Sequence, residues 1–304
     1  MRSREEIREA LSGPVASVRT PFLRGGEIDF DGLRNTVDFN VAAGSRTMLL
    51  TAGDSHLLIL SRREIADLTR ATVEQTAGRA MVVAADGRCD TKTAVEFARF
   101  AREAGADVVM SLPSDWAESC TPETLCAHYA AVSEVMPLMV VTNIFAPYGA
   151  EFGLRTLELV LERVPNVVAI KDDFCGVFAR RMTMLVSERW AVVSGGQKMN
   201  HLDIMPYGAH GYLSTFVTFK PEVAHRYWDA IQRKDLCAAA AVIRDYDDPF
   251  FRLIMGLAGG FDAAIHGVGE LCGIAGRWRR PPHYSLNDAE MEALADALRR
   301  IGVL

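Results

Sequence analysis

The chain repeats one local pattern eight times along its length. Short runs rich in β-branched and other apolar residues recur at intervals of about 20 to 35 residues, and a segment with helical periodicity follows each run. Such alternation is typical of parallel strands joined by right-handed helical crossovers. The sequence therefore predicts an α/β fold, a (β/α)₈ TIM barrel. Its strands are expected at Val15 to Arg19, Thr47 to Leu50, Met81 to Ala84, Asp107 to Met110, Leu138 to Val141, Val167 to Ile170, Ala191 to Val193 and Gly211 to Ser214.

The strand pattern stops after the eighth unit, and the remaining residues have the pattern of helices. The eighth helix is expected to end near Gln232, which is the usual size for such a barrel. We therefore expect two domains, with residues 1–233 forming the barrel that carries the functional site and residues 234–304 forming a C-terminal helical appendage. Within the appendage, Ser285 and Asp288 have the spacing of a helix-capping pair.

The bulk composition excludes several classes of protein. A formal net charge of −6 offers no general attraction for nucleic acid, and no segment approaches the roughly 18 uninterrupted apolar residues of a membrane span. The N-terminal residues lack the apolar stretch of a secretory signal. The six cysteines form no C-x-x-C pair and have no histidine at zinc spacing. We expect a cytoplasmic protein with no nucleic-acid or membrane partner, no metal and no cofactor.

One lysine needs a special explanation. Only five of the 33 Lys and Arg residues are lysines, and Lys171 closes the apolar run Val167 to Ile170. A lysine at the C-terminal end of a buried strand is desolvated, which favours the neutral amine that can attack a carbonyl carbon. The alternative is that Lys171 pairs with Asp172 or Asp173 and only anchors the strand. Alternation along a strand places Asp172 on the opposite face, which weakens that alternative.

The ends of the other expected strands also carry polar residues. In a barrel of this kind, chemistry occurs at the C-terminal ends of the strands. That rule selects Lys171 together with a set of small polar residues. They are Thr51 to Ser55 after the second strand, Asp86 after the third, Ser111 to Trp116 after the fourth, Thr142 and Asn143 after the fifth, Ser194 to Gly196 after the seventh, and Ser214 and Thr215 after the eighth.

Several landmarks occur in a fixed order around Lys171. They are Thr20-Pro21-Phe22, Thr51-Ala52-Gly53-Asp54-Ser55, Gly105-Ala106-Asp107, Ser194-Gly195, Gly208 to Ser214, and Gly276 to Pro282. In the order and spacing of these segments, the chain resembles the dihydrodipicolinate synthase and N-acetylneuraminate lyase family of class I aldolases over nearly its whole length. The second landmark is similar to that family's G-T-T-G-E segment.

The resemblance implies a pyruvate-type mechanism. Lys171 would condense with the keto carbon of a 2-keto acid, and the iminium would act as an electron sink for making or breaking the neighbouring carbon–carbon bond. Backbone N–H groups at Thr51 and Ala52, with the Thr51 hydroxyl, would hold the substrate carboxylate. The resemblance also implies a homo-oligomer, a tetramer or a dimer. It places four further residues at the substrate: Asp54, Asn143, Gly195 and Leu213.

The chain departs from the family pattern at the end of the fifth strand. The family has a tyrosine there, in a Y-N-x-P segment, that relays protons, whereas Thr142 occupies its place here. Tyr148, on the same loop, is a candidate substitute, and its alternative role is that of a loop or interface aromatic. The synthase branch also has an arginine after this segment, and none occurs between Asn143 and Phe152. These departures argue against dihydrodipicolinate synthase itself.

The loop after the fourth strand differs as well. The family's aromatic pair is replaced by Ser114-Asp115-Trp116. A tryptophan there resembles the hydratase-aldolases that cleave aromatic benzylidene-pyruvates, so Trp116 is a candidate to stack on an aromatic or bulky aldehyde. Packing between subunits is the alternative role for Trp116.

These features leave three hypotheses. The leading one is a Schiff-base-forming lyase, an aldolase or hydratase-aldolase, that acts on pyruvate or another 2-keto acid with an unassigned aldehyde. The second is a non-catalytic descendant that binds a keto acid, favoured by the loss of the tyrosine. The third is a phosphosugar aldolase in which Ser194 to Gly196 and Gly208 to Gly211 form a phosphate cradle. His56, His201 and His210 are not expected to be metal ligands.

Overall fold

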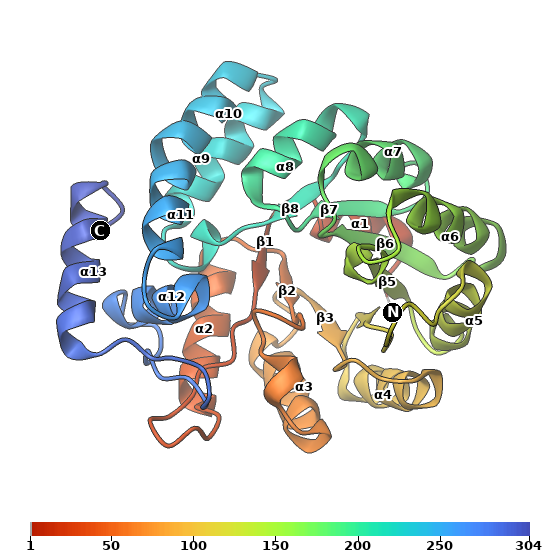
Figure 1. The fold of residues 1–304 in the computed structure, drawn as a ribbon, viewed down its shortest axis with the longest axis horizontal. Helices are drawn as coiled ribbons and strands as arrows, with labels where there is room; N and C mark the ends of the chain where they lie inside the picture. The colour runs from red at the N-terminus through yellow and green to blue at the C-terminus, as the bar shows by residue number, and fades with distance from the viewer. Residues whose placement is uncertain (1) are drawn as a thin grey trace.

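The computed structural model of the chain describes residues 2–304, and its sheet is a closed barrel (Figure 1). The strands are β1 (Gly13–Ser17), β2 (Thr47–Leu49), β3 (Met81–Ala85), β4 (Val108–Ser111), β5 (Leu138–Val141), β6 (Val167–Asp172), β7 (Ala191–Ser194) and β8 (Gly211–Leu213). All neighbours are parallel, and β1 closes the barrel by pairing with both β2 and β8. The predicted TIM barrel is confirmed, and seven of the eight strands begin at the expected residue or next to it.

Helices follow the strands and surround the barrel. Those of the barrel are α1 (Arg4–Ala10), α2 (Phe30–Ala42), α3 (Arg62–Thr76), α4 (Thr91–Ala104), α5 (Pro122–Ser133), α6 (Ala150–Arg163), α7 (Gly176–Val186), α8 (Gln197–Ile204) and α9 (Pro221–Gln232). Short helical turns are η1 (Leu57–Ile59), η2 (Thr142–Phe145), η3 (Met205–Tyr207) and η4 (Phe216–Thr218). Arg4 of α1 donates to the Val167 carbonyl at 3.0 Å, so α1 lies at the N-terminal end of β6.

Capping residues set where the helices begin. Asp90 accepts the Thr93 N–H at the start of α4, and Thr121 caps α5 with Pro122 in its first turn. The expected capping pair at the last helix was wrong, because Asn287 is the cap. Its side chain accepts the Glu290 N–H at 3.0 Å, and Glu290 accepts the Asn287 N–H at 2.8 Å. The Ser285 hydroxyl instead accepts the Arg279 N–H at 2.9 Å.

The C-terminal residues form α10 (Leu236–Val242), η5 (Ile243–Asp247), α11 (Asp248–Met255), α12 (Gly260–Leu271) and α13 (Asp288–Arg300). Together with α9 they gather on one side of the barrel (Figure 1). Phe250 of α11 packs on Phe216 and Phe219, with ring centroids 5.0 and 5.3 Å away. One hydrophobic cluster contains residues from both sides of the expected boundary at residue 233. Within residues 2–304, no helix is both long enough and apolar enough to cross a membrane.

Candidate active site

Lys171 lies at the C-terminal end of β6, beside Val141 of β5 and Val193 of β7 in the barrel register. The residue is only 6% exposed, and its Nζ contacts Oδ1 of Asp173. The Asp173 side chain is partly exposed, so the pair lies at the mouth of the barrel, where solvent reaches the acid. Of the two acids considered from the sequence, Lys171 therefore pairs with Asp173.

Space for this pair comes from Gly195, which follows β7. A Cβ atom at this position would lie 2.9 Å from Lys171 Nζ and 2.8 Å from the Asp172 carbonyl oxygen, and it would overlap Oδ1 of Asp173. The Gly195 N–H also donates to the Asp172 carbonyl at 2.7 Å. Gly195 is thus beside the amine, and its missing side chain lets the amine and the acid meet.

Asp172 braces the loop after β6 and takes no part in the lysine pair. Its Oδ1 accepts from the Thr142 hydroxyl and from the Phe174 N–H, each at 3.1 Å, and its Oδ2 accepts from Asn200 Nδ2 at 3.1 Å. Burial raises the pKa of Asp172, and the hydrogen bonds from Asn200 and Thr142 oppose that rise. Asp172, the last residue of β6, and Asp173, the first residue beyond it, therefore have different partners.

The Thr142 hydroxyl belongs to the same loop network. It donates to Asp172, and it accepts the N–H groups of Asp173 and Phe174 at 2.8 and 3.1 Å. A hydroxyl has one hydrogen to donate and two lone pairs, so these contacts use its full capacity. Thr142 therefore positions Asp173. Its expected role in proton relay stays a prediction, and within residues 2–304 its hydroxyl makes no hydrogen bond to Lys171.

The loop after β2 was expected to hold a carboxylate through the N–H groups of Thr51 and Ala52, and for Thr51 that expectation was wrong, because its N–H is used within the loop. The Thr51 N–H donates to the Ser55 hydroxyl at 3.0 Å, and the Thr51 hydroxyl accepts the Asp54 N–H at 3.1 Å. These groups close the loop on itself. Among the described residues, the N–H groups of Ala52 and Gly53 have no intramolecular acceptor, so they are the donors that this loop leaves for an anion.

Two residues that the sequence argument did not select also lie here: Arg19, just beyond β1, and its neighbour Ser17. Arg19 Nη2 is 3.5 Å from Asp54 Oδ1. Burial favours the neutral form of Asp54, but the Arg19 charge and a hydrogen bond from Ser17 hold its pKa below the usual value. The charge of Lys171 acts in the same direction, so Asp54 lies within electrostatic reach of both cations.

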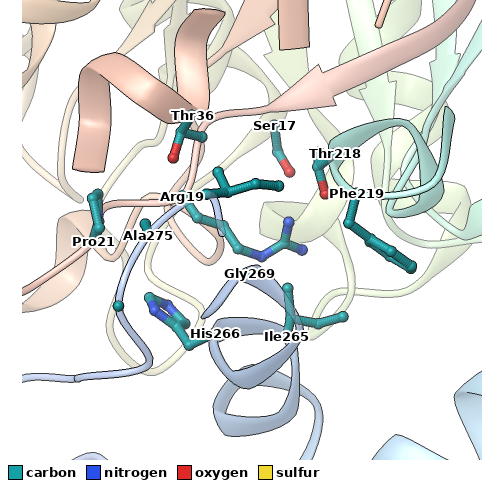
Figure 2. A pocket seen from close by; sticks show the side chains of 12 residues that line it. Ser17, Arg19, Pro21, Thr36, Thr218, Phe219, Ile265, His266, Gly269 and Ala275 are labelled. Carbon is teal, nitrogen blue, oxygen red and sulfur yellow. The ribbon is translucent and has the colours of Figure 1, made fainter. Parts of the chain in front are cut away.

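The sequence held one signal for this arrangement. Alternate residues of a strand point to the same face. In the first expected strand one face therefore carries an apolar residue, a hydroxyl residue and a cation, which are Val15, Ser17 and Arg19. Figure 2 shows the Arg19 side chain extending between Ser17 and Thr218 on one side and Ile265 and His266 of α12 on the other. The part of the site contributed by α12 had no local signal in the sequence.

Comparison with known proteins places this geometry in a family. A sequence profile of the dihydrodipicolinate synthetase family matches residues 10–301. The chain belongs to this family. The dihydrodipicolinate synthetase family consists of class I pyruvate-dependent aldolases and lyases, and the suspected relationship is therefore confirmed.

Relatives within the family are distant in sequence. The chain is 30% identical over 240 residues to a 4-hydroxy-tetrahydrodipicolinate synthase of Nitrosospira multiformis, covering 77% of this chain and 78% of that protein. It is 27% identical over 298 residues to the enzyme of that name from Chlorobaculum parvum, covering 97% and 98%.

Solved structures share the fold. Dihydrodipicolinate synthase from Aquifex aeolicus superposes with a TM-score of 0.80 at 21% identity, over 96% of this chain and 98% of the other. N-acetylneuraminate lyase from Mycoplasma synoviae gives a TM-score of 0.81 at 20% identity, again over 96% and 98%.

Tyr148, the candidate substitute for the family tyrosine, contacts a different loop. Its hydroxyl accepts the Cys120 N–H at 2.8 Å, and its ring stacks on Phe152 with centroids 4.0 Å apart. Desolvation raises the pKa of Tyr148 to about 12. In this position Tyr148 fastens the segment that joins β4 to α5, and within residues 2–304 no hydrogen bond links it to Lys171. A catalytic role for Tyr148 stays a prediction.

Trp116 stands on the segment that Tyr148 fastens, and it is 87% exposed. It lines a cleft of about 240 Å³ together with Asn143 and Ile144. The structure therefore brings Trp116 and Asn143 together, as two of the expected substrate contacts. The next two residues, Ala117 and Glu118, have φ values of 54° and 55°, which turn the loop so that the indole faces water.

The expected phosphate cradle at the seventh and eighth strands was wrong. Gly195 and Gly196 follow β7, whereas Gly208 precedes β8 and packs on Ser187, which precedes β7. The two glycine segments therefore lie at opposite ends of the strands. Leu213 is at the same end as Gly195, because it ends β8 beside Val15 of β1.

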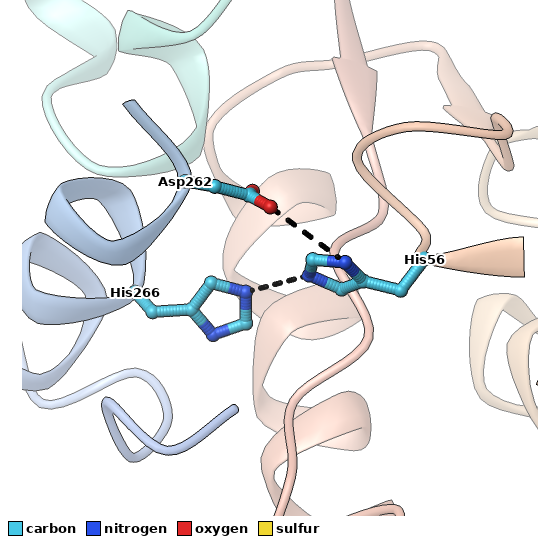
Figure 3. A group of neighbouring side chains, drawn as sticks. All are labelled: His56, Asp262 and His266. Atoms are coloured by element: carbon cyan, nitrogen blue, oxygen red, sulfur yellow. Dashed lines mark hydrogen bonds and ion pairs between the residues drawn. The ribbon is translucent and has the colours of Figure 1, made fainter. Parts of the chain in front are cut away.

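Only one group of His, Cys, Asp and Glu side chains within residues 2–304 has the spacing of a metal site: His56, Asp262 and His266. His56 uses Nε2 toward His266 Nε2 at 3.0 Å and Nδ1 toward Asp262 Oδ2 at 3.7 Å (Figure 3). Each of the two ring nitrogens of His56 therefore has a partner of its own. Arg279 already pairs with Asp262. Burial lowers the pKa of His56 to about 4 and that of His266 well below its usual value, so both rings are neutral at pH 7.

Proposed function

We propose that the chain is a Schiff-base-forming lyase, an aldolase or hydratase-aldolase, that acts on pyruvate or another 2-keto acid together with an aldehyde. One observation carries the proposal: a buried lysine amine at the C-terminal end of β6 contacts a carboxylate that solvent reaches. Membership of a family of class I pyruvate-dependent aldolases and lyases supports the same reaction class.

Asp173 supplies the acid–base group that the missing tyrosine leaves open. Transfer of a proton from Lys171 to Asp173 frees the amine to attack the keto carbon. Asp173 then returns the proton to the carbinolamine oxygen, which leaves as water and gives the iminium. In the cleavage direction Asp173 takes the proton of the substrate hydroxyl, the carbon–carbon bond breaks, and its electron pair moves into the iminium to give an enamine and an aldehyde. Protonation and hydrolysis of the enamine release the keto acid.

Borohydride trapping tests this proposal. After incubation with pyruvate and borohydride, the peptide that carries Lys171 is expected to gain the mass of a reduced pyruvate adduct. The variant Lys171→Met is expected to lose the adduct, and Lys234→Arg, at an exposed turn lysine, is expected to retain it on Lys171. Failure to trap an adduct with any 2-keto acid contradicts the proposal.

The second candidate is a non-catalytic keto-acid-binding protein. The full hydrogen bonding of Thr142, which stands where the family has its proton-relaying tyrosine, favours it. This candidate predicts that a keto acid raises the melting temperature without turnover. Aldol cleavage of any compound in a panel of hydroxy-keto acids eliminates it.

A further inference from the structure

Arg19 is a buried cation with few partners. The residue is 8% exposed, and its Nε has no hydrogen-bond partner within residues 2–304. Its one polar contact is the 3.5 Å approach of Nη2 to Asp54, which is at the outer limit of a hydrogen bond. Its guanidinium carbon is 5.6 Å from the centroid of the Phe261 ring. A guanidinium has five N–H donors, and burying them without acceptors costs free energy, so this site is built for an anion.

The space beside Arg19 fits a small planar group. The cavity has a volume of about 40 Å³, which is room for about three water molecules or one carboxylate. Ser17 and Thr218 bring hydroxyls to it, while Phe219 and Ile265 form apolar walls (Figure 2). Both hydroxyls are engaged within the protein: Thr218 donates to the Thr215 carbonyl at 2.7 Å, and Ser17 donates to the carboxylate of Asp54. The N–H groups of Arg19 are therefore the donors that this cavity offers to a ligand.

The surrounding charges favour a carboxylate at this place. Asp54 is the acid that faces Arg19, and its low pKa keeps it ionised while both Arg19 and Lys171 act on it. Burial keeps His266, which lines the cavity, uncharged. Asp54 engages Nη2 alone, so the remaining N–H groups of Arg19 face no other acid among the described residues. Planar guanidinium N–H pairs match the two oxygens of a carboxylate.

We propose that Arg19 binds a second carboxylate of the substrate, so that the enzyme acts on keto acids that carry two acid groups. This inference rests on the proposed Schiff-base function, in which Lys171 takes the keto carbon and the loop after β2 takes the first carboxylate. Arg19 enters from β1, and it supplies a cation that the segment from Asn143 to Phe152 lacks.

A binding experiment tests the Arg19 site without any covalent step. Calorimetry measures the affinity of the wild-type protein for succinate and for butyrate, which has the same number of carbon atoms and one carboxylate fewer. We expect about tenfold tighter binding of succinate, the worth of one charge-assisted hydrogen bond. The preference is expected to vanish in Arg19→Gln, to persist in part in Arg19→Lys, and to grow in Asp54→Asn. An equal preference in wild type and a folded Arg19→Gln protein overturns the inference, as does tighter binding of inorganic phosphate than of succinate.

A trapping experiment separates this inference from the proposed function. Borohydride adducts on Lys171 are compared for 2-oxoglutarate and 2-oxopentanoate, which differ only in the second carboxylate. The ratio of the two adduct yields is expected to fall about tenfold in Arg19→Gln and to stay unchanged in Arg63→Gln, an exposed arginine of α3. Adducts with an unaltered ratio overturn the Arg19 assignment and leave the Schiff-base function standing. No adduct from any keto acid overturns the Schiff-base function, and the succinate comparison then decides the Arg19 site alone.

Discussion

At the scale of single residues, the candidate site is a set of acid and cation neighbours with separate tasks. Asp173 contacts the amine, Asp172 holds the loop, and the charges of Lys171 and Arg19 both act on Asp54. Lys171 was predictable because one lysine closing an apolar strand is a local signal in the sequence. Asp173 was considered only as an anchor, since sequence spacing does not tell which of two adjacent acids turns toward the amine until the strand ends and the loop bends.

Replacing Asp173 tests the proposed acid–base role. We expect Asp173→Asn to slow formation of the pyruvate adduct on Lys171 by about a hundredfold or more, because the amide cannot accept the amine's proton. Rates are measured by quenching with borohydride at timed intervals across a pH series, and Asp67→Asn on the exposed face of α3 is the control. Equal adduct rates and equal pH profiles in wild type and Asp173→Asn contradict the role.

At the scale of elements, the strand positions followed from apolar runs, and capping residues such as Thr121 mark where helices begin. The contacts between elements could not be predicted in this way. Hydrophobic periodicity indicates which face of an element is buried, but it does not indicate which other element that face contacts. His56 and His266 are 210 residues apart, yet their rings join the loop after β2 to α12. The ion pair of Lys198 Nζ with Asp247 Oδ1, at 2.7 Å, likewise joins α8 to η5.

That ion pair gives a stability prediction. Lys198 is 1% exposed, and its Nζ also lies 4.5 Å from the centroid of the Phe216 ring. We expect Lys198→Met to lower the free energy of unfolding by about 3 to 5 kcal/mol, because it leaves the Asp247 charge buried and unpaired. Denaturant melts measure the change, and Lys220→Met, at a half-exposed pair with Glu222, is expected to cost under about 1 kcal/mol.

The double variant Lys198→Met with Asp247→Leu sharpens that test. Removing both charges leaves no unpaired acid, so we expect most of the lost stability to return. A double variant no more stable than Lys198→Met alone shows that packing at this joint, and not the buried charge, sets the cost.

At the scale of the whole molecule, the barrel and the C-terminal helices share one hydrophobic cluster. We therefore expect them to unfold as one unit. The sequence predicted both parts and their order, because strand and helix periodicities differ. It did not predict that Phe250 would complete a cluster with Phe216 and Phe219, since nothing local marks which apolar face of the late helices meets the barrel. The division at residue 233 therefore describes the chain order better than it describes the packing.

One buried acid makes the stability of this unit depend on pH. Asp86 follows β3, accepts from Cys89 Sγ at 3.0 Å and from the Leu112 N–H at 3.2 Å, and burial raises its pKa to about 7. Between the unfolded pKa near 3.8 and this value, the folded state holds the proton and the unfolded state does not. The contribution of Asp86 to the free energy of unfolding is therefore largest below about pH 4. It falls by on the order of 4 kcal/mol as the pH rises to about 7.

Urea unfolding at about pH 5 and about pH 8 measures this dependence. Buried histidines such as His56, with a lowered pKa, make the opposite contribution and make it in both proteins, so the comparison is between the proteins. Asp86→Asn, which carries no ionisable proton, is expected to gain stability relative to the wild type between the two pH values and to be the more stable protein at the higher pH. Asp203→Asn on α8, at a partly exposed pair with Arg180, is expected to keep the wild-type slope. A wild-type slope in Asp86→Asn assigns the dependence to another group.

The bare backbone at Gly195 has a consequence for how a site of this kind diverges. Any side chain there collides with the carboxylate at 173 before it reaches anything else, since a methyl group at this position already overlaps that oxygen. A related sequence with a larger residue at position 195 therefore needs a shorter side chain, or no acid, at position 173. We expect the residues at these two positions to change together among related sequences.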